Sequence, residues 1–132
     1  PNVVEPFTLK LADKTETDVR EWLEEFDPTE CLAVIEAVAS SPQMGVKSAF
    51  TFGRSYGFLR GLLVGRRIAF VEARPQAWQK ALGCLTKGDK NISKARAQQL
   101  FPAVKVTHAT ADALLLATYC RRYDEQLFWK VE

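Results

Sequence analysis

The sequence has few residues of the kinds that bind transition metals or form disulfides. Its 132 residues include one histidine and three cysteines, and the cysteines lie far apart at positions 31, 84 and 120. No Cys-x-x-Cys motif or Cys/His cluster is present, so a zinc module has no support. An odd number of widely spaced cysteines gives no disulfide framework either. We therefore expect Cys31, Cys84 and Cys120 to be buried or half-buried thiols in a reducing cytoplasm.

Long apolar runs are also lacking. The longest, over residues 111–117, is interrupted by Asp112, whereas a membrane-spanning helix needs about 20 apolar residues. No linker-like stretch or signal peptide is visible, and neither a GxGxxG loop nor a Walker lysine motif supports a nucleotide cofactor. With 47% hydrophobic and 26% charged residues, the composition predicts one globular domain over residues 1–132 and no membrane segment.

Acidic residues are scarce over most of the chain. Residues 1–36 contain ten acidic and three basic residues, whereas residues 37–132 contain six acidic and fifteen basic ones. Between Ala37 and Ala111 the acidic residues are Glu72 and Asp89, against twelve Lys and Arg. Such segregation indicates a polyanionic partner for the second part, although solvated basic helix faces would give the same composition.

The apolar pattern predicts alternating strands and helices. We expect strands at residues 5–11, 31–35, 67–71 and 104–106, helices at residues 15–26, 46–64, 75–82, 93–100 and 107–119, and a polar loop at residues 87–91. The continuous apolar run at 31–35 is typical of a strand covered on both faces, and residues 67–71 are predicted to form a second buried strand. The alternation favours an α/β fold whose mostly parallel sheet is flanked by helices.

Two carboxylates stand out by position. Glu36 follows an apolar strand, and ligands in open α/β sheets gather at the carboxyl ends of strands, although a polar residue often simply ends a strand. Asp112 interrupts an apolar helical stretch, so we expect its carboxylate to point towards a packed surface, where an unpaired charge is costly. Either the N-terminus of the helix or a divalent cation could stabilise that charge.

His108 precedes Asp112 by four residues and would share its helix face. A lone histidine is commonly a structural donor or acceptor, but beside a metal carboxylate it can orient water or move a proton. Carboxylates from two distant segments that meet at a strand end would suit Mg²⁺.

Residues 47–57 (KSAFTFGRSYG) interleave aromatic, basic and glycine residues. Basic side chains neutralise phosphates, and aromatic rings stack on bases. Packing of an aromatic helix face is the simpler interpretation for Phe50 and Phe58. The remaining candidates for nucleic-acid binding in this segment are Lys47, Phe52, Arg54 and Tyr56.

Six segments between residues 30 and 120 follow one another in a characteristic order: VIE at 34–36, QMGVKSAFTFGRSYG at 43–57, RPQAWQK at 74–80, SKARA at 93–97, LFP at 100–102 and HATADALLLATY at 108–119. Together they resemble the RuvC-type Holliday junction resolvases, especially the phage and prophage-like branch. The resemblance implies an RNase H-like fold and a homodimer that cuts branched, four-way DNA during recombination and repair. It also implies a cytoplasmic, nucleoid-associated protein of a bacterial or phage-infected cell.

In that family, acidic residues from separate segments hold two Mg²⁺ ions, with Mn²⁺ as a possible substitute, and the metals drive phosphodiester hydrolysis. By position, Glu36 matches the acid on a central strand and Asp112 the last acid, on the C-terminal helix. Family members usually have an acid or a histidine shortly before that last aspartate. Here His108 stands four residues before it, and Ala109 occupies a common acid position.

The resemblance also assigns a DNA-facing surface. Residues 52–57 match the segment that approaches the junction centre. The phosphate contacts implied are Lys47, Arg54, Lys80, Lys87, Lys90 and Lys94.

The first 30 residues depart from the family. Family members open with a strand that carries an essential Asp in an Asp-Pro-Gly-like turn, and here Asp27 and Pro28 are followed by Thr29 after a predicted helix. Either the N-terminal strand lies upstream of Pro1, or this protein has lost its first metal ligand. In the second case a non-catalytic DNA-binding or scaffolding relative is the alternative function. A different RNase H-like nuclease is a third hypothesis.

Overall fold

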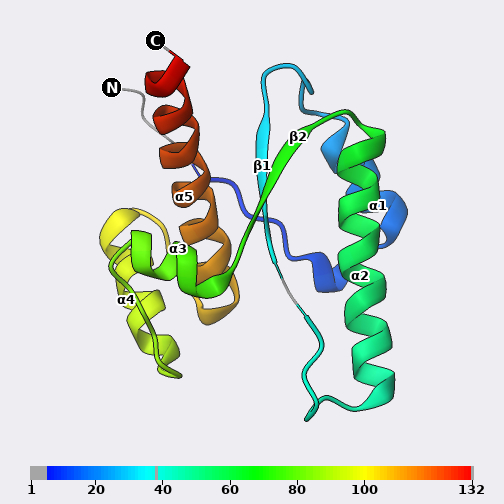
Figure 1. Cartoon of the computed structure of the whole chain (residues 1–132), viewed down its shortest axis with the longest axis horizontal. Helices are drawn as coiled ribbons and strands as arrows, with labels where there is room; N and C mark the ends of the chain where they lie inside the picture. The colour runs from blue at the N-terminus through cyan, green and yellow to red at the C-terminus, as the bar shows by residue number, and fades with distance from the viewer. Residues whose placement is uncertain (1–5, 38, 132) are drawn as a thin grey trace. The chain divides into compact units, whose positions relative to one another are not determined.

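A computed structural model describes residues 6–37 and 39–131, with side chains described up to residue 124. The described chain forms two compact units. The sheet unit, residues 16–74, contains α1 (Glu16–Leu23), β1 (Leu32–Glu36), α2 (Val46–Gly65) and β2 (Ala69–Ala73). The helical unit, residues 6–15 and 75–131, contains the short 3₁₀ helix η1 (Leu11–Asp13), α3 (Pro75–Ala81), α4 (Lys90–Leu100) and α5 (His108–Val131) (Figure 1).

The two strands form a parallel pair joined through α2. Leu32 pairs with Ala69 and Glu36 with Ala73, and the Ala37 N–H extends the ladder by donating to the Ala73 carbonyl at 2.8 Å. A parallel pair needs a long crossover connection, which α2 supplies. The prediction of an α/β fold with parallel pairing is confirmed. The sheet found in the described part of the chain has two strands.

The sheet is less covered than its apolar sequence predicts. Ile35 is buried, but the rest of β1 is half-buried, and Ala69 in β2 is exposed. The expectation of strands covered on both faces is therefore wrong for this pair. The buried residues of the sheet unit are Val19, Ile35, Leu63, Ile68 and Ala73.

The N-terminal half of α2 extends beyond the strands (Figure 1). Of the apolar residues on this helix, Leu63 near its C-terminus is buried. Phe50 is 72% exposed and Val46 is 90% exposed. Phe50 therefore does not pack in a core, which corrects the sequence interpretation, because helical spacing alone does not show how far a helix projects past its neighbours.

The end of α2 explains why β2 starts later than predicted. The N–H groups of Arg66, Arg67 and Ile68 donate back to carbonyls of α2, and Arg67 has a positive φ of 59°. A residue in this left-handed region terminates a helix rather than opening a strand. The strand consequently covers Ala69–Ala73 and includes Glu72, instead of residues 67–71.

The core of the helical unit is formed by α3, α4 and α5. Pro75 opens α3, as its fixed φ favours. Trp78, Leu82 and Leu115 are almost completely buried, and the Arg96 guanidinium ties α4 to the end of α3 by donating from Nε to the Leu82 carbonyl at 2.9 Å. The three cysteines are free, with Cys84 and Cys120 buried and Cys31 half-buried, which confirms the predicted burial of these thiols.

Two predicted strands are wrong. Glu5 lies outside the described residues, and residues 6–10 have no regular structure before η1 begins. Residues 104–106 form no strand, because two of the backbone groups that would pair with another strand are hydrogen-bonded to the Gln98 side chain. Gln98 Nε2 donates to the Val104 carbonyl, and the Val106 N–H donates to Gln98 Oε1.

The last helix is longer than its apolar pattern predicts. We expected it to end near Tyr119, but α5 continues to Val131. None of the helices in the described ranges is both long enough and apolar enough to cross a lipid bilayer.

Candidate functional site

The first turn of α5 is fixed by two threonines. The Thr110 N–H donates to Thr107 Oγ1 at 3.3 Å, and the Thr107 N–H donates to Thr110 Oγ1 at 3.1 Å. This reciprocal pair satisfies backbone groups that a helix start would otherwise leave unpaired. It makes His108 the first residue of the helix and puts Asp112 one turn further along.

The start of α4 is fixed by Asp89. Its Oδ1 accepts from the Asn91 N–H at 3.0 Å, which caps the helix and makes Lys90 the first helical residue. The predicted loop over residues 87–91 is therefore too long by two residues. Lys87 and Gly88, which have positive φ angles of 46° and 92°, form the turn before the cap.

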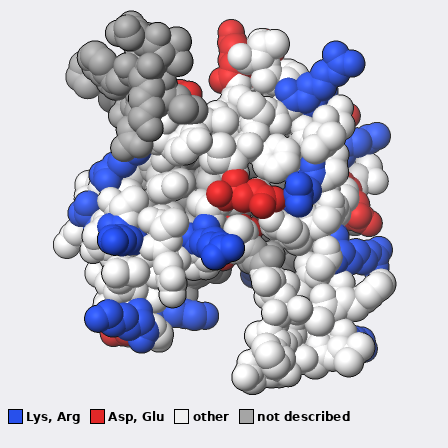
Figure 2. Space-filling view, in the orientation of Figure 1, with Lys and Arg blue, Asp and Glu red and all other residues white. Residues whose placement is uncertain are grey.

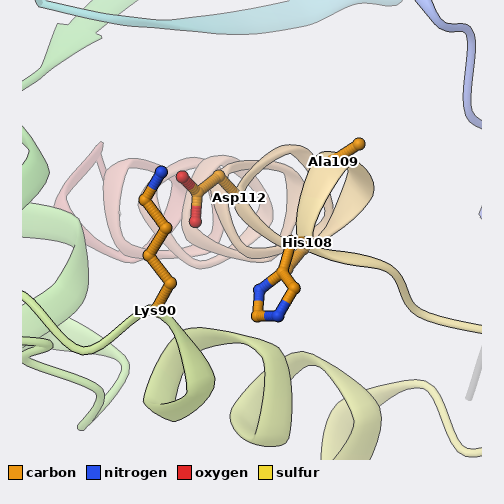
Figure 3. A pocket seen from close by; sticks show the side chains of 5 residues that line it. Lys90, His108, Ala109 and Asp112 are labelled. Atoms are coloured by element: carbon orange, nitrogen blue, oxygen red, sulfur yellow. The ribbon is translucent and has the colours of Figure 1, made fainter.

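These two helix starts enclose a pocket of about 240 Å³, lined by Lys90, His108, Ala109, Ala111 and Asp112. Figure 3 shows the Lys90 amine directed towards the Asp112 carboxylate, with the His108 ring on the side of α4. The prediction that His108 and Asp112 share a helix face is confirmed, since both line this pocket. Ala109 also lines it and contributes no ligand atom.

The pocket changes the chemistry of Asp112. Its side chain is exposed, which corrects the expectation that it points into a packed surface. The pocket walls nevertheless remove part of its water, and this desolvation raises the pKa of the carboxyl group, while the charge of Lys90 acts in the opposite direction. A carboxylate that is incompletely solvated, with a lysine beside it, favours further positive charge or a hydrogen-bond donor.

The donor set of this pocket does not make a magnesium site by itself. Mg²⁺ prefers octahedral oxygen coordination, usually with one or two carboxylates, waters and substrate phosphates. The pocket supplies one carboxylate, Asp112, and one imidazole, His108, with the Lys90 cation on the same side. Across the described residues, no group of three or more His, Cys, Asp and Glu side chains is arranged to hold a metal.

Glu36 lies in the other unit. It is the last residue of β1, half-buried and at the carboxyl end of the strand as predicted. Because Glu36 belongs to the sheet unit and Asp112 to the helical unit, the expected meeting of the two carboxylates stays a prediction.

A second depression lies on the exposed half of α2. It has a volume of about 390 Å³, and its lining residues are Lys47, Ser48, Thr51, Phe52 and Ser55. Lys47 and Phe52 are two of the predicted DNA contacts. The three hydroxyl residues were missed, although their spacing of three and four residues on a helix is visible in the sequence. A cation, an aromatic ring and hydroxyl groups on one face suit a sugar–phosphate backbone and its bases.

Two further candidates have partners within the sheet unit. Arg54 Nη2 lies 3.6 Å from Glu16 Oε1, with both side chains largely exposed. Tyr56 is half-buried, and its hydrogen bond to the Glu72 carboxylate raises the pKa of the phenol. Arg60 Nε lies 3.1 Å from that carboxylate. Tyr56 is thus anchored to β2 as well as accessible from outside.

The other predicted phosphate contacts lie in the helical unit. Lys80 is in the last turn of α3, and Lys87 is in the turn before α4. Lys90 and Lys94 are on α4. All of these except the half-buried Lys94 are exposed. Figure 2 shows Lys and Arg gathered on the face over α3 and α4, with few acidic side chains among them.

No protein-family model matches the chain, and no curated protein sequence is significantly similar to it. The resemblance to RuvC-type resolvases therefore rests on the residues of the chain alone.

Proposed function

We propose that this chain is a Mg²⁺-dependent, RuvC-type endonuclease with an RNase H-like fold that acts as a homodimer on four-way DNA junctions. The observation that carries the proposal is the pocket in which His108, Asp112 and Lys90 come together at the starts of α5 and α4. Titratable groups with a perturbed pKa in a pocket are a common mark of an active site. The parallel β1–β2 pair with Glu36 at its carboxyl end supports the same proposal.

Each pocket residue has a distinct part in this function. Lys90, directed into the pocket, neutralises a DNA phosphate and holds the scissile group against the start of α5. His108 orients the attacking water and accepts its proton. Asp112 holds that water or the imidazole by a hydrogen bond, and its incomplete solvation makes each such interaction stronger than it would be in bulk water.

Mg²⁺ would supply activation of the water and stabilisation of the leaving oxygen. Because the pocket presents a single carboxylate, metal binding requires Glu36 and at least one further acidic ligand. The exposed face of α2, with Lys47 and Phe52, binds DNA through phosphate and base contacts.

The test is cleavage of a four-way junction by the full-length protein. We expect Glu36→Gln and Asp112→Asn each to lower the cleavage rate by a factor of about 100 or more while junction binding persists, since each removes a charge used in the transition state. Glu25→Gln, an exposed acid of the sheet unit, is the matched control and should cleave normally. Normal cleavage by either of the first two variants overturns the proposed mechanism.

The position of Lys90 favours a second candidate, a non-catalytic DNA-binding relative. The lysine lies beside Asp112, where a metal-binding nuclease would be expected to place another carboxylate. Junction binding measured with and without Mg²⁺ separates the two functions. Tight, Mg²⁺-independent binding without cleavage supports the second candidate, and preference for RNA–DNA hybrids would instead indicate a different RNase H-like nuclease.

A further inference from the structure

We infer that Gln98 is a positioning residue that sets the place of His108 in the pocket, and this inference rests on the proposed function. Gln98 lies on α4 and is not one of the residues that line the pocket. It is also not among the candidate residues predicted from the sequence. Its amide instead holds the segment that leads from α4 to α5.

All the polar atoms of the Gln98 amide are used on this segment. Nε2 donates to the Phe101 carbonyl at 3.0 Å and to the Val104 carbonyl at 2.8 Å. Oε1 accepts from the Val106 N–H at 3.3 Å. Backbone N–H and C=O groups in such a segment need hydrogen-bond partners. In a strand, a neighbouring strand would supply them, and here the Gln98 side chain does.

The segment controls the start of α5. Between the end of α4 and His108 the chain has no regular structure, and one turn, from the Val104 N–H to the Phe101 carbonyl, is formed by backbone atoms alone. Val106 is buried, and Thr107, which pairs with Thr110, follows it directly. A shift of Val106 would therefore move Thr107 and the first residue of the helix, His108.

Helix α4 carries Gln98 and also contributes a residue to the lining of the pocket. Lys90 and Gln98 are both on α4, eight residues or about two helical turns apart. By binding the Val106 N–H from α4, Gln98 fixes His108 relative to Lys90, which lines the same pocket. Small errors in such a distance have large effects on reaction rate.

Only an amide fits these contacts, because it combines two N–H donors with an acceptor oxygen. Met at position 98 has a similar length and no strong hydrogen-bonding group. Glu keeps an acceptor for the Val106 N–H but sets a carboxylate oxygen against two carbonyls. Gln99 is the matched control, since it is on the same helix and its Oε1 accepts from Arg96 Nη1 at 3.3 Å rather than touching the segment.

The experiment compares Gln98→Met, Gln98→Glu and Gln99→Met in the full-length protein. His108 is the one histidine of the given sequence, and its imidazole NMR signal is identified as the one that His108→Gln removes. For Gln98→Met we expect amide exchange at Val106 to become about tenfold faster, which corresponds to the loss of one hydrogen bond. For Gln98→Glu we expect a smaller increase, because the acceptor for the Val106 N–H remains while the two carbonyls lose their donor. We also expect Gln98→Met to shift or broaden the His108 signal and to lower kcat for junction cleavage about tenfold, with KM unchanged.

Unchanged Val106 exchange and an unchanged His108 signal in Gln98→Met overturn the inference, as does an equal response to Gln99→Met. A loss of stability without a kcat effect would show that Gln98 has a structural role only, which also overturns it. If the wild-type protein binds junctions and does not cleave them, the proposed function fails, while the exchange and His108 measurements still decide whether Gln98 positions the histidine.

Discussion

Among single residues, Asp112 shows most clearly how the fold changes chemistry. It is exposed, yet the pocket walls raise the pKa of its carboxyl group. Burial also raises the pKa of the Cys84 and Cys120 thiols, so they remain protonated and unreactive. Packing accounts for the cysteines, whereas the incompletely solvated carboxylate opposes folding, and the proposed function supplies a reason for its presence.

Asp112→Asn should therefore stabilise the protein while abolishing its proposed activity. The raised pKa means that the folded state binds this proton more readily than the unfolded state, so the carboxyl group reduces stability as pH rises above its ordinary value of 3.8. We expect Asp112→Asn to have a higher Tm than wild type at pH 7. Thermal unfolding between pH 3 and pH 8 should show the difference in Tm shrinking as pH falls towards 3.8 and disappearing below it. A lower Tm for the variant at pH 7 would contradict this account.

The sequence predicts part of this site at the residue scale. His108 and Asp112 were expected on one face because helical spacing is local. Lys90 was expected in a loop, and the prediction missed that Asp89 caps a helix there. Gln98 was missed altogether, because its role depends on three backbone groups and no side-chain pattern reveals those.

At the scale of elements, helices were easier to predict than strands. The five α-helices found in the described residues all have counterparts in the apolar pattern, since their periodicity and caps are local. A strand needs a partner, which lies elsewhere in the chain. The strands predicted at residues 31–35 and 67–71 correspond to β1 and β2, which begin one and two residues later than predicted. Residues 104–106 (Val-Lys-Val) form a shorter and less apolar segment, and they are bonded to the Gln98 side chain instead of a strand.

The start of α5 gives a prediction at this scale. Thr107→Ala removes the hydroxyl that accepts from the Thr110 N–H, and the loss of such a cap lowers the free energy of unfolding by about 1 kcal/mol. Thr118→Ala in the same helix is the control, because the Thr118 hydroxyl bonds to the Leu114 carbonyl, four residues back along the helix. Urea unfolding should show a loss for Thr107→Ala and none for Thr118→Ala. Equal stabilities would show that the cap contributes nothing.

At the scale of the whole molecule, composition predicted the class of fold and the distribution of charge but not the assembly of the proposed site. The parallel βαβ arrangement follows from alternating apolar patterns. Whether Glu36 and Asp112 act together depends on the placement of the sheet unit against the helical unit. That placement is decided by side-chain packing between distant parts of the chain, and local patterns do not specify it.

Because charge is segregated along the chain, we predict that replacing a lysine by alanine affects DNA binding differently in residues 1–36 and in residues 37–132. Lys47 lies on α2, which contains no acidic residue, and lines the depression beside Phe52. Lys10 is also exposed but lies in the acid-rich first 36 residues, where its Nζ is 3.9 Å from Asp13 Oδ2.

Lys47→Ala should therefore weaken junction binding several-fold at low salt, and it should reduce the slope of log Kd against log salt concentration by about one, because one phosphate contact is lost. Lys10→Ala should change neither quantity, since its charge is offset by Asp13. Fluorescence anisotropy with a labelled four-way junction over a series of salt concentrations measures both. If the two variants have the same effect, DNA does not bind along α2, and the basic residues of α3 and α4 become the surface to test.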